Sequence, residues 1–414
     1  MSENKDNVFY YLWLQKLIGV GSSKLRDIIE YFGSAKEAFL ATEAQLNESN
    51  IFSKREITYR QRISEDDIKA VIDYCQKSNI RIITPEDEEY PECFNLIESP
   101  PTVIFAKGQK LDMSVPHFGI VGSRRADDFG KKAAFSLAAR LSLSGFTIVS
   151  GGALGVDKMA HLGAIASGKS TVVVMGSGID SDYLKSNAGL RKKALEKGTL
   201  ISEFWPKSSA VKFNFPIRNR LISALSSGVA VIEAGCKSGA LITASYAMEQ
   251  GKEIFAMPGS INDKNFEGNN NLIRDGAIPL LTVEDILAVY SGRFEDKITY
   301  NNLLTSSVKS VLYKYLEKEK NTTTGNTAKK KKADTCEATD RVSDNTQAAP
   351  VMPKEINACE VARKIYNAFK EETEMADVLS LRSGVTGATF IAAVTELELK
   401  GYIKAVPVGR YKRL

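Results

Sequence analysis

Cysteine and histidine are scarce in this chain of 414 residues, which has five cysteines and two histidines. The cysteines are scattered without a C-x-x-C pair, so the sequence indicates neither a disulfide framework nor a zinc site, and free thiols are typical of a reducing cytosol. Two histidines leave little for metal binding or for a Ser-His-Asp triad. We therefore expect a cytoplasmic protein without a metal centre.

Long apolar runs and a strong charge bias are also missing. No run approaches the about 20 apolar residues that a membrane span requires, and the first residues are polar, so neither a membrane segment nor a signal peptide is predicted. The net charge is +5, with 43% hydrophobic and 25% charged residues, which is typical of a soluble globular protein. The length indicates two or three domains at roughly 150 residues each. Because the net charge is only mildly positive, any surface that binds nucleic acid would have to be a local patch of cations.

Residues 1–76 are predicted to form a helical domain, because apolar residues recur at helical spacing between positions 8 and 75. Gly19-Val20-Gly21 lies between the first two predicted helices and resembles a helix-hairpin-helix turn, whose free N–H groups can hold a phosphate. The alternative is a plain turn between two helices, and a signal of only two glycines favours this alternative.

From about Ile80 onward, short apolar runs end in glycine and alternate with segments of helix length. This pattern is typical of buried parallel strands in βα units. Residues 77–292 are therefore predicted to form an α/β domain with a Rossmann-like, doubly wound sheet, which binds ligands outside the carboxyl ends of its strands. The clearest predicted strands cover residues 117–121, 146–150, 171–175, 229–233 and 253–257.

The turn after the first of these strands, Gly122-Ser123-Arg124, has the composition of an anion site. Glycine allows close approach, the following helix offers unpaired N–H groups, and Arg124 supplies a fork for phosphate oxygens. The alternative is a tight βα turn with an arginine that faces solvent.

Residues 212–220, Lys-Phe-Asn-Phe-Pro-Ile-Arg-Asn-Arg, combine three cations with two aromatic rings. Rings that stack bases beside cations that neutralise phosphates are suited to a single nucleic-acid strand. Pro216 is expected at the first position of a helix. In the alternative interpretation, the two rings belong to the core and the cations are solvated. The candidate strand-binding residues are Lys212, Phe213, Phe215, Arg218, Asn219 and Arg220.

Two more segments point to the same rim of the predicted sheet. Ser238 and Gly239 lie in a loop that opens a helix and could bind another phosphate, and Lys185 could lie at the mouth of the cleft, where an ordinary polar loop is equally compatible. Residues 163–170 match the P-loop pattern, but a helical stretch precedes them and a strand follows, which is the inverse of the required order. No nucleotide cofactor is therefore implied.

Residues 293–354 are predicted to be a disordered linker, because residues 321–353 are rich in Thr, Lys, Asp, Asn and Ala and have almost no large apolar side chain. In residues 355–414, predicted helices are followed by a β-hairpin, which is a winged-helix pattern. Some such modules bind duplex DNA and others bind only protein.

Together, the motifs resemble the DNA-processing protein A family, also called DprA or Smf. The resemblance covers nearly all of residues 80–290, with the motifs in the family's order. Two positions depart from the family pattern: Leu154 stands where the family usually has a basic residue, and Tyr183-Leu184 where it usually has Tyr-Pro. The matching segments are Val121-Gly-Ser-Arg124, Ser150 to His161, Ser202-Glu203, Phe213 to Arg220, Glu233 to Thr243 and Ala256 to Gly276.

The resemblance implies a cytoplasmic homodimer that binds single-stranded DNA and loads the RecA recombinase onto incoming strands in natural transformation, without catalytic turnover and without a cofactor. It implies that the turn at Gly122 and residues 212–220 form the walls of the strand-binding pocket. It also implies a dimer or recombinase surface near Leu272, Ile273 and Ile278.

The alternative function is enzymatic. Related Rossmann-like folds include nucleoside-monophosphate phosphoribohydrolases, and a glycine-rich rim with arginine and Glu203 or Glu233 could hold a nucleotide for N-glycosidic cleavage, with Glu233 at a strand end as the general acid. That chemistry would require a pre-organised catalytic pair, whereas the predicted cleft is dominated by cations.

Overall fold

The computed structural model describes residues 3–182, 187–294, 296–299, 305–317, 359–369, 373–385, 387–406 and 410–413. Lys185 and residues 318–358, which hold most of the predicted disordered linker, lie outside the described residues. The chain divides into two compact units, Met1–Ala333 and Asp334–Leu414.

The first unit begins with six short helices, as the apolar spacing predicts. Four of them start at a serine or threonine, Ser34, Thr42, Ser53 and Ser64, whose side-chain oxygen accepts a hydrogen bond from the first turn. These caps satisfy N–H groups that a helix leaves without a partner, which stabilises helices of this length. The helices are α1 (Glu3–Ile18), α2 (Leu25–Phe32), α3 (Ala35–Leu40), α4 (Glu43–Glu48), α5 (Lys54–Arg60) and α6 (Glu65–Lys77).

A nine-stranded sheet follows, with the strand order β1-β2-β6-β5-β4-β3-β7-β8-β9. The strands from β6 to β9 in this order are parallel, whereas β2 pairs antiparallel with both β1 and β6. The Rossmann-like α/β fold expected from the sequence is thus confirmed. The strands are β1 (Arg81–Ile83), β2 (Ile104–Gly108), β3 (His117–Val121), β4 (Thr147–Ser150), β5 (Thr171–Met175), β6 (Thr199–Ser202), β7 (Gly228–Val231), β8 (Glu253–Ala256) and β9 (Ile278–Pro279).

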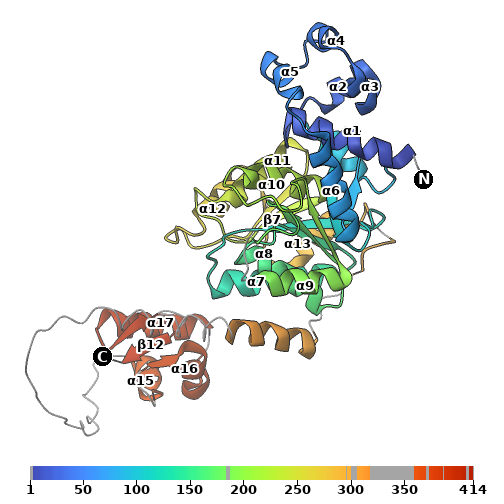
Figure 1. Cartoon of the computed structure of the whole chain (residues 1–414). Coiled ribbons are helices and arrows are strands. Elements are labelled where there is room, and N and C mark those ends of the chain that lie inside the picture. Colours follow the sequence, from blue (N-terminus) through green and yellow to red (C-terminus); the bar gives the residue numbers. More distant parts are fainter. Residues whose placement is uncertain are drawn as a thin grey trace, which may run out of the picture. The chain divides into compact units, whose positions relative to one another are not determined.

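Helices cover both faces of this sheet (Figure 1). On one face, α7 (Asp128–Leu143), α8 (Val156–Ala166) and α9 (Ala188–Lys197) bury a core with Phe118, Phe135 and Phe146. The other face is covered by α10 (Asn214–Leu225) and α11 (Gly239–Glu249), whose apolar side chains meet those of β7, while α12 (Glu267–Arg274) follows β8. The chain moves outward from β3 to β6 and then returns to β7 beside β3. The carboxyl ends of β3 and β7 therefore form the switch point where such sheets bind ligands.

Two details bear on the sequence predictions. The P-loop-like residues 163–170 join the end of α8 to the start of β5, which confirms the inverse order. Residues 306–317, assigned to the linker from composition, form a helix instead. Its side chains Val308, Leu312 and Leu316 recur every four residues and are buried with α13 (Val283–Tyr290), so the linker prediction was wrong for this stretch.

The second unit contains α15 (Glu360–Asn367), β10 (Thr373–Met375), α16 (Ala376–Ser383), α17 (Gly387–Leu399), β11 (Ile403–Val406) and β12 (Arg410–Arg413). Its three strands pair antiparallel in the order β10-β12-β11, and Ile365, Leu379 and Leu397 lie in its core. Helices followed by a hairpin agree with the expected pattern, and the winged-helix assignment stays a prediction.

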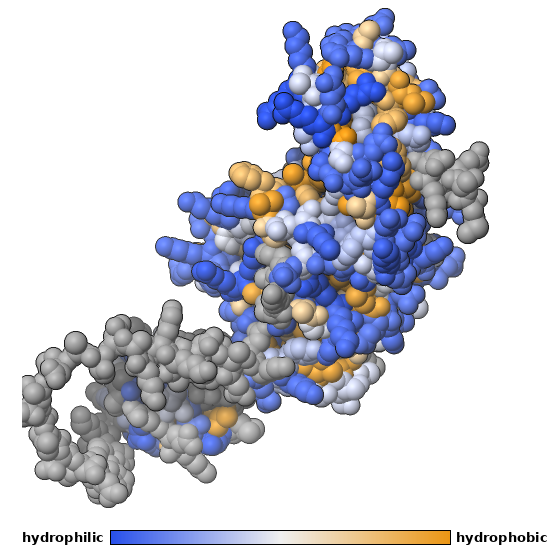
Figure 2. Space-filling view, in the orientation of Figure 1, coloured by the Kyte–Doolittle hydropathy of each residue, from blue (hydrophilic) through white to orange (hydrophobic). Residues whose placement is uncertain are grey.

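The visible face of the first unit is largely hydrophilic, with hydrophobic side chains in small groups (Figure 2). Among the described residues, no helix combines the length and the apolar character of a membrane span.

Candidate functional site

The turn after β3 packs against the start of α8 and the segment that follows β7. A Cβ atom on Gly122 would lie 2.6 Å from Val156 Cγ2, so only glycine fits here. The Ser123 N–H donates to the carbonyl of Glu233 (2.6 Å), and the Ser123 carbonyl accepts from the Val156 N–H (3.2 Å). The backbone of Ser123 is thus used inside the fold, and the exposed group that the turn presents is Arg124.

Arg124 meets a residue from the other predicted segment. Its guanidinium carbon lies 4.7 Å from the centroid of the Phe215 ring, within the range of a cation–π contact. Phe215 is half-buried, and a Cβ atom on Gly176 would lie 2.8 Å from its Cδ1 atom. The structure therefore brings together the turn after β3 and residues 212–220, which are far apart in the sequence.

The exposed part of residues 212–220 lies at the start of α10. Phe213 is 82% exposed, and the neighbouring Lys212 is exposed and forms no ion pair with any described residue. Pro216 was predicted at the first position of a helix, but it is the third residue of α10. It still lies in the first turn, where a missing N–H costs no helical hydrogen bond. We call Arg124, Lys212, Phe213 and Phe215 the strand-binding surface.

Arg218 points into the protein, contrary to the expected solvent-facing position. It is 4% exposed, and its Nη1 donates to the carbonyls of Gly151 (2.6 Å) and Val174. Its Nε donates to Oδ1 of Asn219 (3.1 Å). Arg218 lies three residues after Phe215, so the two side chains project from the same side of α10, and Arg218 reaches the carbonyls at the ends of β4 and β5.

Asn219 and Arg220 are also buried. The Asn219 Nδ2 donates to the Gly239 carbonyl (3.2 Å), which ties α10 to the start of α11. The Arg220 Nη2 lies 2.7 and 2.6 Å from the two carboxylate oxygens of Glu203, in a pair whose side chains are 5% and 2% exposed. The prediction that Arg220 faces a phosphate therefore differs from the structure, because an internal carboxylate already neutralises it.

The remaining predicted positions lie around this surface or at the sheet edge. Ser238 is the N-cap of α11, where its Oγ accepts from the Ala240 N–H (3.3 Å), and Gly239 is exposed. Leu272, Ile273 and Ile278 are all half-buried, and Leu272 and Ile278 pack partly against the cores of the two sheet faces.

A small pocket next to Phe215 contains residues that the sequence reasoning missed. Its inner volume is about 20 Å³, enough for about one water molecule. Asn187 is 1% exposed, and its Nδ2 donates to the Gly152 carbonyl (3.0 Å), while its Oδ1 has no partner among the residues that the structure describes. No spacing rule singles out this asparagine. The pocket is lined by Gly151, Gly152, Ala153, Val173, Met175, Gly176, Ser177, Asn187, Arg191 and Phe215.

Buried ionisable groups lie directly behind this rim. Burial raises the pKa of Asp157, although Arg218 opposes this shift. Burial and the nearby Arg218 lower the pKa of His161 to about 3, so this ring is neutral, and its Nδ1 lies 2.7 Å from the Thr171 hydroxyl. His161 is therefore a structural residue. Burial raises the pKa of Glu233 to about 6.

The described residues contain no group of three or more His, Cys, Asp or Glu side chains placed to hold a metal ion. The cations of the strand-binding surface and the glycines at the strand ends are instead suited to an extended anion. A backbone of phosphates with stackable bases fits this combination of exposed ring and unpaired cations.

Known proteins share this arrangement of sequence and fold. The chain is 35% identical to Protein Smf of Synechocystis sp. over 292 residues, which cover 69% of this chain and 73% of that protein. It is 38% identical to the DNA processing protein DprA of Bacillus subtilis over 212 residues, 51% of this chain and 71% of that protein. The X-ray structure of DNA processing protein A from Streptococcus pneumoniae superposes with a TM-score of 0.61 at 31% identity, covering 68% of this chain and 97% of that one.

The model of one protein family matches half of the chain. This family is described as DNA recombination-mediator protein A, and the match spans residues 81–291, which include the whole rim from β3 to β8. The glycine turn after β3, residues 212–220 and the nine-stranded sheet all lie within that span. The chain therefore belongs to the DNA recombination-mediator protein A family, whose members carry the names DprA and Smf.

Proposed function

We propose that this protein binds single-stranded DNA at the strand-binding surface and acts as a recombination mediator. The observation that carries the proposal is the contact between Arg124 and Phe215, which places a cation and a ring from separate segments side by side. Next to them, Phe213 offers an almost fully exposed ring and Lys212 an unpaired ammonium group.

The physical basis is stacking combined with phosphate neutralisation. An aromatic ring that stacks on a base contributes about 1–3 kcal/mol, and it accepts any base because every base has a flat face. A duplex keeps its base faces covered, so an exposed ring favours unpaired strands. Phe213 is 82% exposed, so the face of its ring is open to a base.

Binding without chemical turnover is the second part of the proposal. The two carboxylates considered for N-glycosidic cleavage are withdrawn from solvent: Glu203 is 1% exposed and paired with Arg220, and Glu233 is 0% exposed. A general acid has to reach the leaving group. Incubation with nucleoside monophosphates, followed by chromatography, should release no base, and release at enzymatic rates would favour the hydrolase alternative.

Strand preference is tested with a fluorescent oligo-dT in an anisotropy titration at several salt concentrations. For single strands the logarithm of the affinity falls with the logarithm of salt by about 0.7 for each neutralised phosphate. We expect a salt slope that corresponds to several neutralised phosphates. Duplex DNA of the same length should compete poorly for binding. Equal competition by the duplex, or no saturable binding, contradicts the proposal.

We further propose that the bound strand is delivered to a RecA-type recombinase during uptake of DNA, and that the protein works as a homodimer in the cytoplasm. The family description as a recombination mediator supports the first part. For the dimer, β9 lies at one edge of the sheet, and the next residues include Leu281, which is 72% exposed. Sedimentation of the wild type and of Leu281→Lys tests the dimer. DNA-dependent ATP hydrolysis by the recombinase on strands coated with a single-strand binding protein tests the delivery.

A further inference from the structure

The turn of residues 19–21, between α1 and α2, lies against the first turn of α10. Gly19 and Gly21 have φ angles of +82° and +81°, which favour glycine at both positions. A Cβ atom on Gly21 would lie 2.7 Å from Ile217 Cγ2, whereas a Cβ atom on Gly19 would meet nothing within 4 Å. Only Gly21 therefore permits a close approach between the N-terminal helices and α10.

An internal carboxylate occupies the anion position at this turn. Burial raises the pKa of Glu203, while Arg220 and a backbone hydrogen bond from Gly21 oppose that shift. The Gly21 N–H, which a helix-hairpin-helix turn would offer to a phosphate, is thus one of the groups that stabilise the Glu203 carboxylate. Together with the close approach to Ile217, this favours the plain-turn interpretation.

Helix α1 also holds the segment around Glu203. The Gln15 Nε2 donates to the Glu203 carbonyl (3.0 Å), and the Gln15 Oε1 accepts from the Trp205 indole N–H (2.9 Å). Gln15 itself is 2% exposed. The buried amide of Gln15 thus donates one hydrogen bond and accepts another across the boundary between the helical domain and the sheet domain. Two such bonds fix the relative position of α1 and the segment around Glu203.

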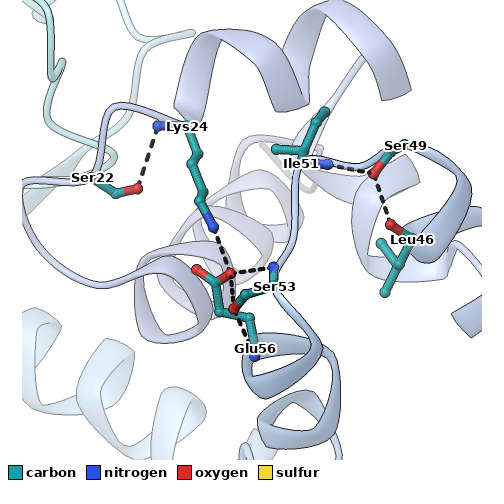
Figure 3. A network of polar contacts seen from close by, with 7 residues as sticks. All are labelled: Ser22, Lys24, Leu46, Ser49, Ile51, Ser53 and Glu56. Carbon is teal, nitrogen blue, oxygen red and sulfur yellow. Dashed lines mark hydrogen bonds and ion pairs between the residues drawn. The ribbon is translucent and has the colours of Figure 1, made fainter.

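Lys24, a cation close to the turn in the sequence, is already paired. The Lys24 Nζ lies 2.5 Å from Glu56 Oε2, and the Lys24 N–H donates to Ser22 Oγ (3.3 Å), as Figure 3 shows. Glu56 in turn accepts from the N–H and hydroxyl of Ser53 at the start of α5. The turn therefore has the features of a packing contact and lacks those of a second DNA site.

This contact bears on the strand-binding surface through α10. Ile217 and Arg220, which meet the turn and its carboxylate, belong to the same helix as Phe215 and follow Phe213 by less than two turns. We propose that Gly21 and Glu203 are positioning residues, which set the first turn of α10 so that Phe213 and Phe215 stand beside Arg124. This inference rests on the proposed function of that surface.

The two glycines of the turn offer a matched pair of variants. Alanine at either position is strained, because both φ angles are left-handed. Gly19→Ala and Gly21→Ala should therefore lower the thermal midpoint by comparable amounts, with an added loss for Gly21→Ala. Only Gly21→Ala should displace α10 and weaken binding of fluorescent oligo-dT, by about 2- to 30-fold, the range of typical indirect coupling. Equal affinity losses in both variants, or none in Gly21→Ala, overturn the inference.

A second variant and a DNA-free measurement complete the test. Gly21→Ala with Ile217→Ala removes the side chain that the new methyl group meets, so it should bind DNA as Gly19→Ala does, even if Gly21→Ala alone does not fold. Hydrogen exchange of the amides at residues 214–218 should accelerate in Gly21→Ala and not in Gly19→Ala, in the absence of DNA. Failure of the wild type to bind DNA contradicts the proposed function, whereas unchanged exchange in Gly21→Ala contradicts this inference.

Discussion

The guanidinium carbon of Arg124 lies 4.7 Å from the centroid of the Phe215 ring, so a turn after β3 and the start of α10 share one surface. The two residues are supplied from opposite sides of the switch point between β3 and β7, since α10 leads from β6 back to β7. A strand that lies across the carboxyl ends of the sheet would meet both. The following predictions separate residues that meet DNA from residues that hold the fold.

Arg124→Ala should weaken binding of oligo-dT and reduce the salt slope by about 0.7, the value for one lost phosphate contact on a single strand. The thermal midpoint should change little, because Arg124 is exposed. The measurement is an anisotropy titration at several salt concentrations. Arg125→Ala is the matched control, since it removes the same charge from the adjacent exposed position, while the cation–π contact with Phe215 is made by Arg124. Identical salt slopes for the two variants would show that DNA binding depends on net charge and not on the position of Arg124.

Phe213→Ala should cost about 1–3 kcal/mol of binding free energy, the usual contribution of one stacked base. Its stability should stay within about 0.5 kcal/mol of the wild type, because an 82% exposed ring contributes little packing. Tyr313→Ala serves as the control, since Tyr313 is a 60% exposed aromatic residue outside this surface. An unchanged affinity for Phe213→Ala would argue that the ring does not stack on bases.

Arg220→Met should destabilise the protein by about 3–5 kcal/mol, because it leaves Glu203 buried without its partner. Combining it with Glu203→Gln should recover part of this loss, since the uncompensated charge is gone. Denaturant titrations give both values. As a surface comparison, Lys69→Met breaks the exposed pair with Glu65 and should cost less than about 1 kcal/mol. A small effect of Arg220→Met would contradict the internal role of Arg220.

Glu233→Gln should change how stability depends on pH. Burial raises the pKa of Glu233 to about 6 from its ordinary 4.5. The hydrogen bond from the Asp127 N–H and the charge of Lys131 oppose this shift, while the negative charges of Asp127 and Asp263 add to it. The folded protein then binds a proton that the unfolded chain releases between these values, so this group lowers stability as pH rises from 4.5 to 6. Above that window, Glu233→Gln should be more stable than the wild type by about 2 kcal/mol. Parallel stability curves for the two proteins across pH 4–7 would exclude this assignment.

Asn187→Ala should lower the stability of the protein by about 0.5–1.5 kcal/mol, because it removes the hydrogen bond from the Asn187 Nδ2 to the Gly152 carbonyl. The Asn187 Oδ1 is buried beside a pocket with room for about one water molecule, so a base cannot reach it. Denaturant titrations measure the loss of stability. Affinities for dT, dC and dA homopolymers should keep the same ratios in the variant and the wild type, and a change in these ratios would contradict the structural role of Asn187.

Local chemistry explains which features were predictable. The strand that ends directly before Gly122 and the helix-then-strand order around residues 163–170 were predictable from short-range patterns, because these patterns depend on neighbours in the chain. Asn187 and the burial of Arg218 were not accessible, since each depends on carbonyl groups of other strands, Gly152 for the first and Gly151 with Val174 for the second.

By itself, the sequence determined the alternation of strands and helices, the glycine-rich strand ends and the concentration of cations and rings in residues 212–220, because periodicity and turn chemistry are local. Only the tertiary structure decided which cations remain for a phosphate. Arg218 and Arg220 turn inward, where carbonyls and Glu203 compensate their charge, while Arg124 and Lys212 stay exposed. The physical reason is that every residue of α10 from Arg218 to Leu225 is buried, whereas Lys212 precedes this helix and Arg124 lies in the turn after β3.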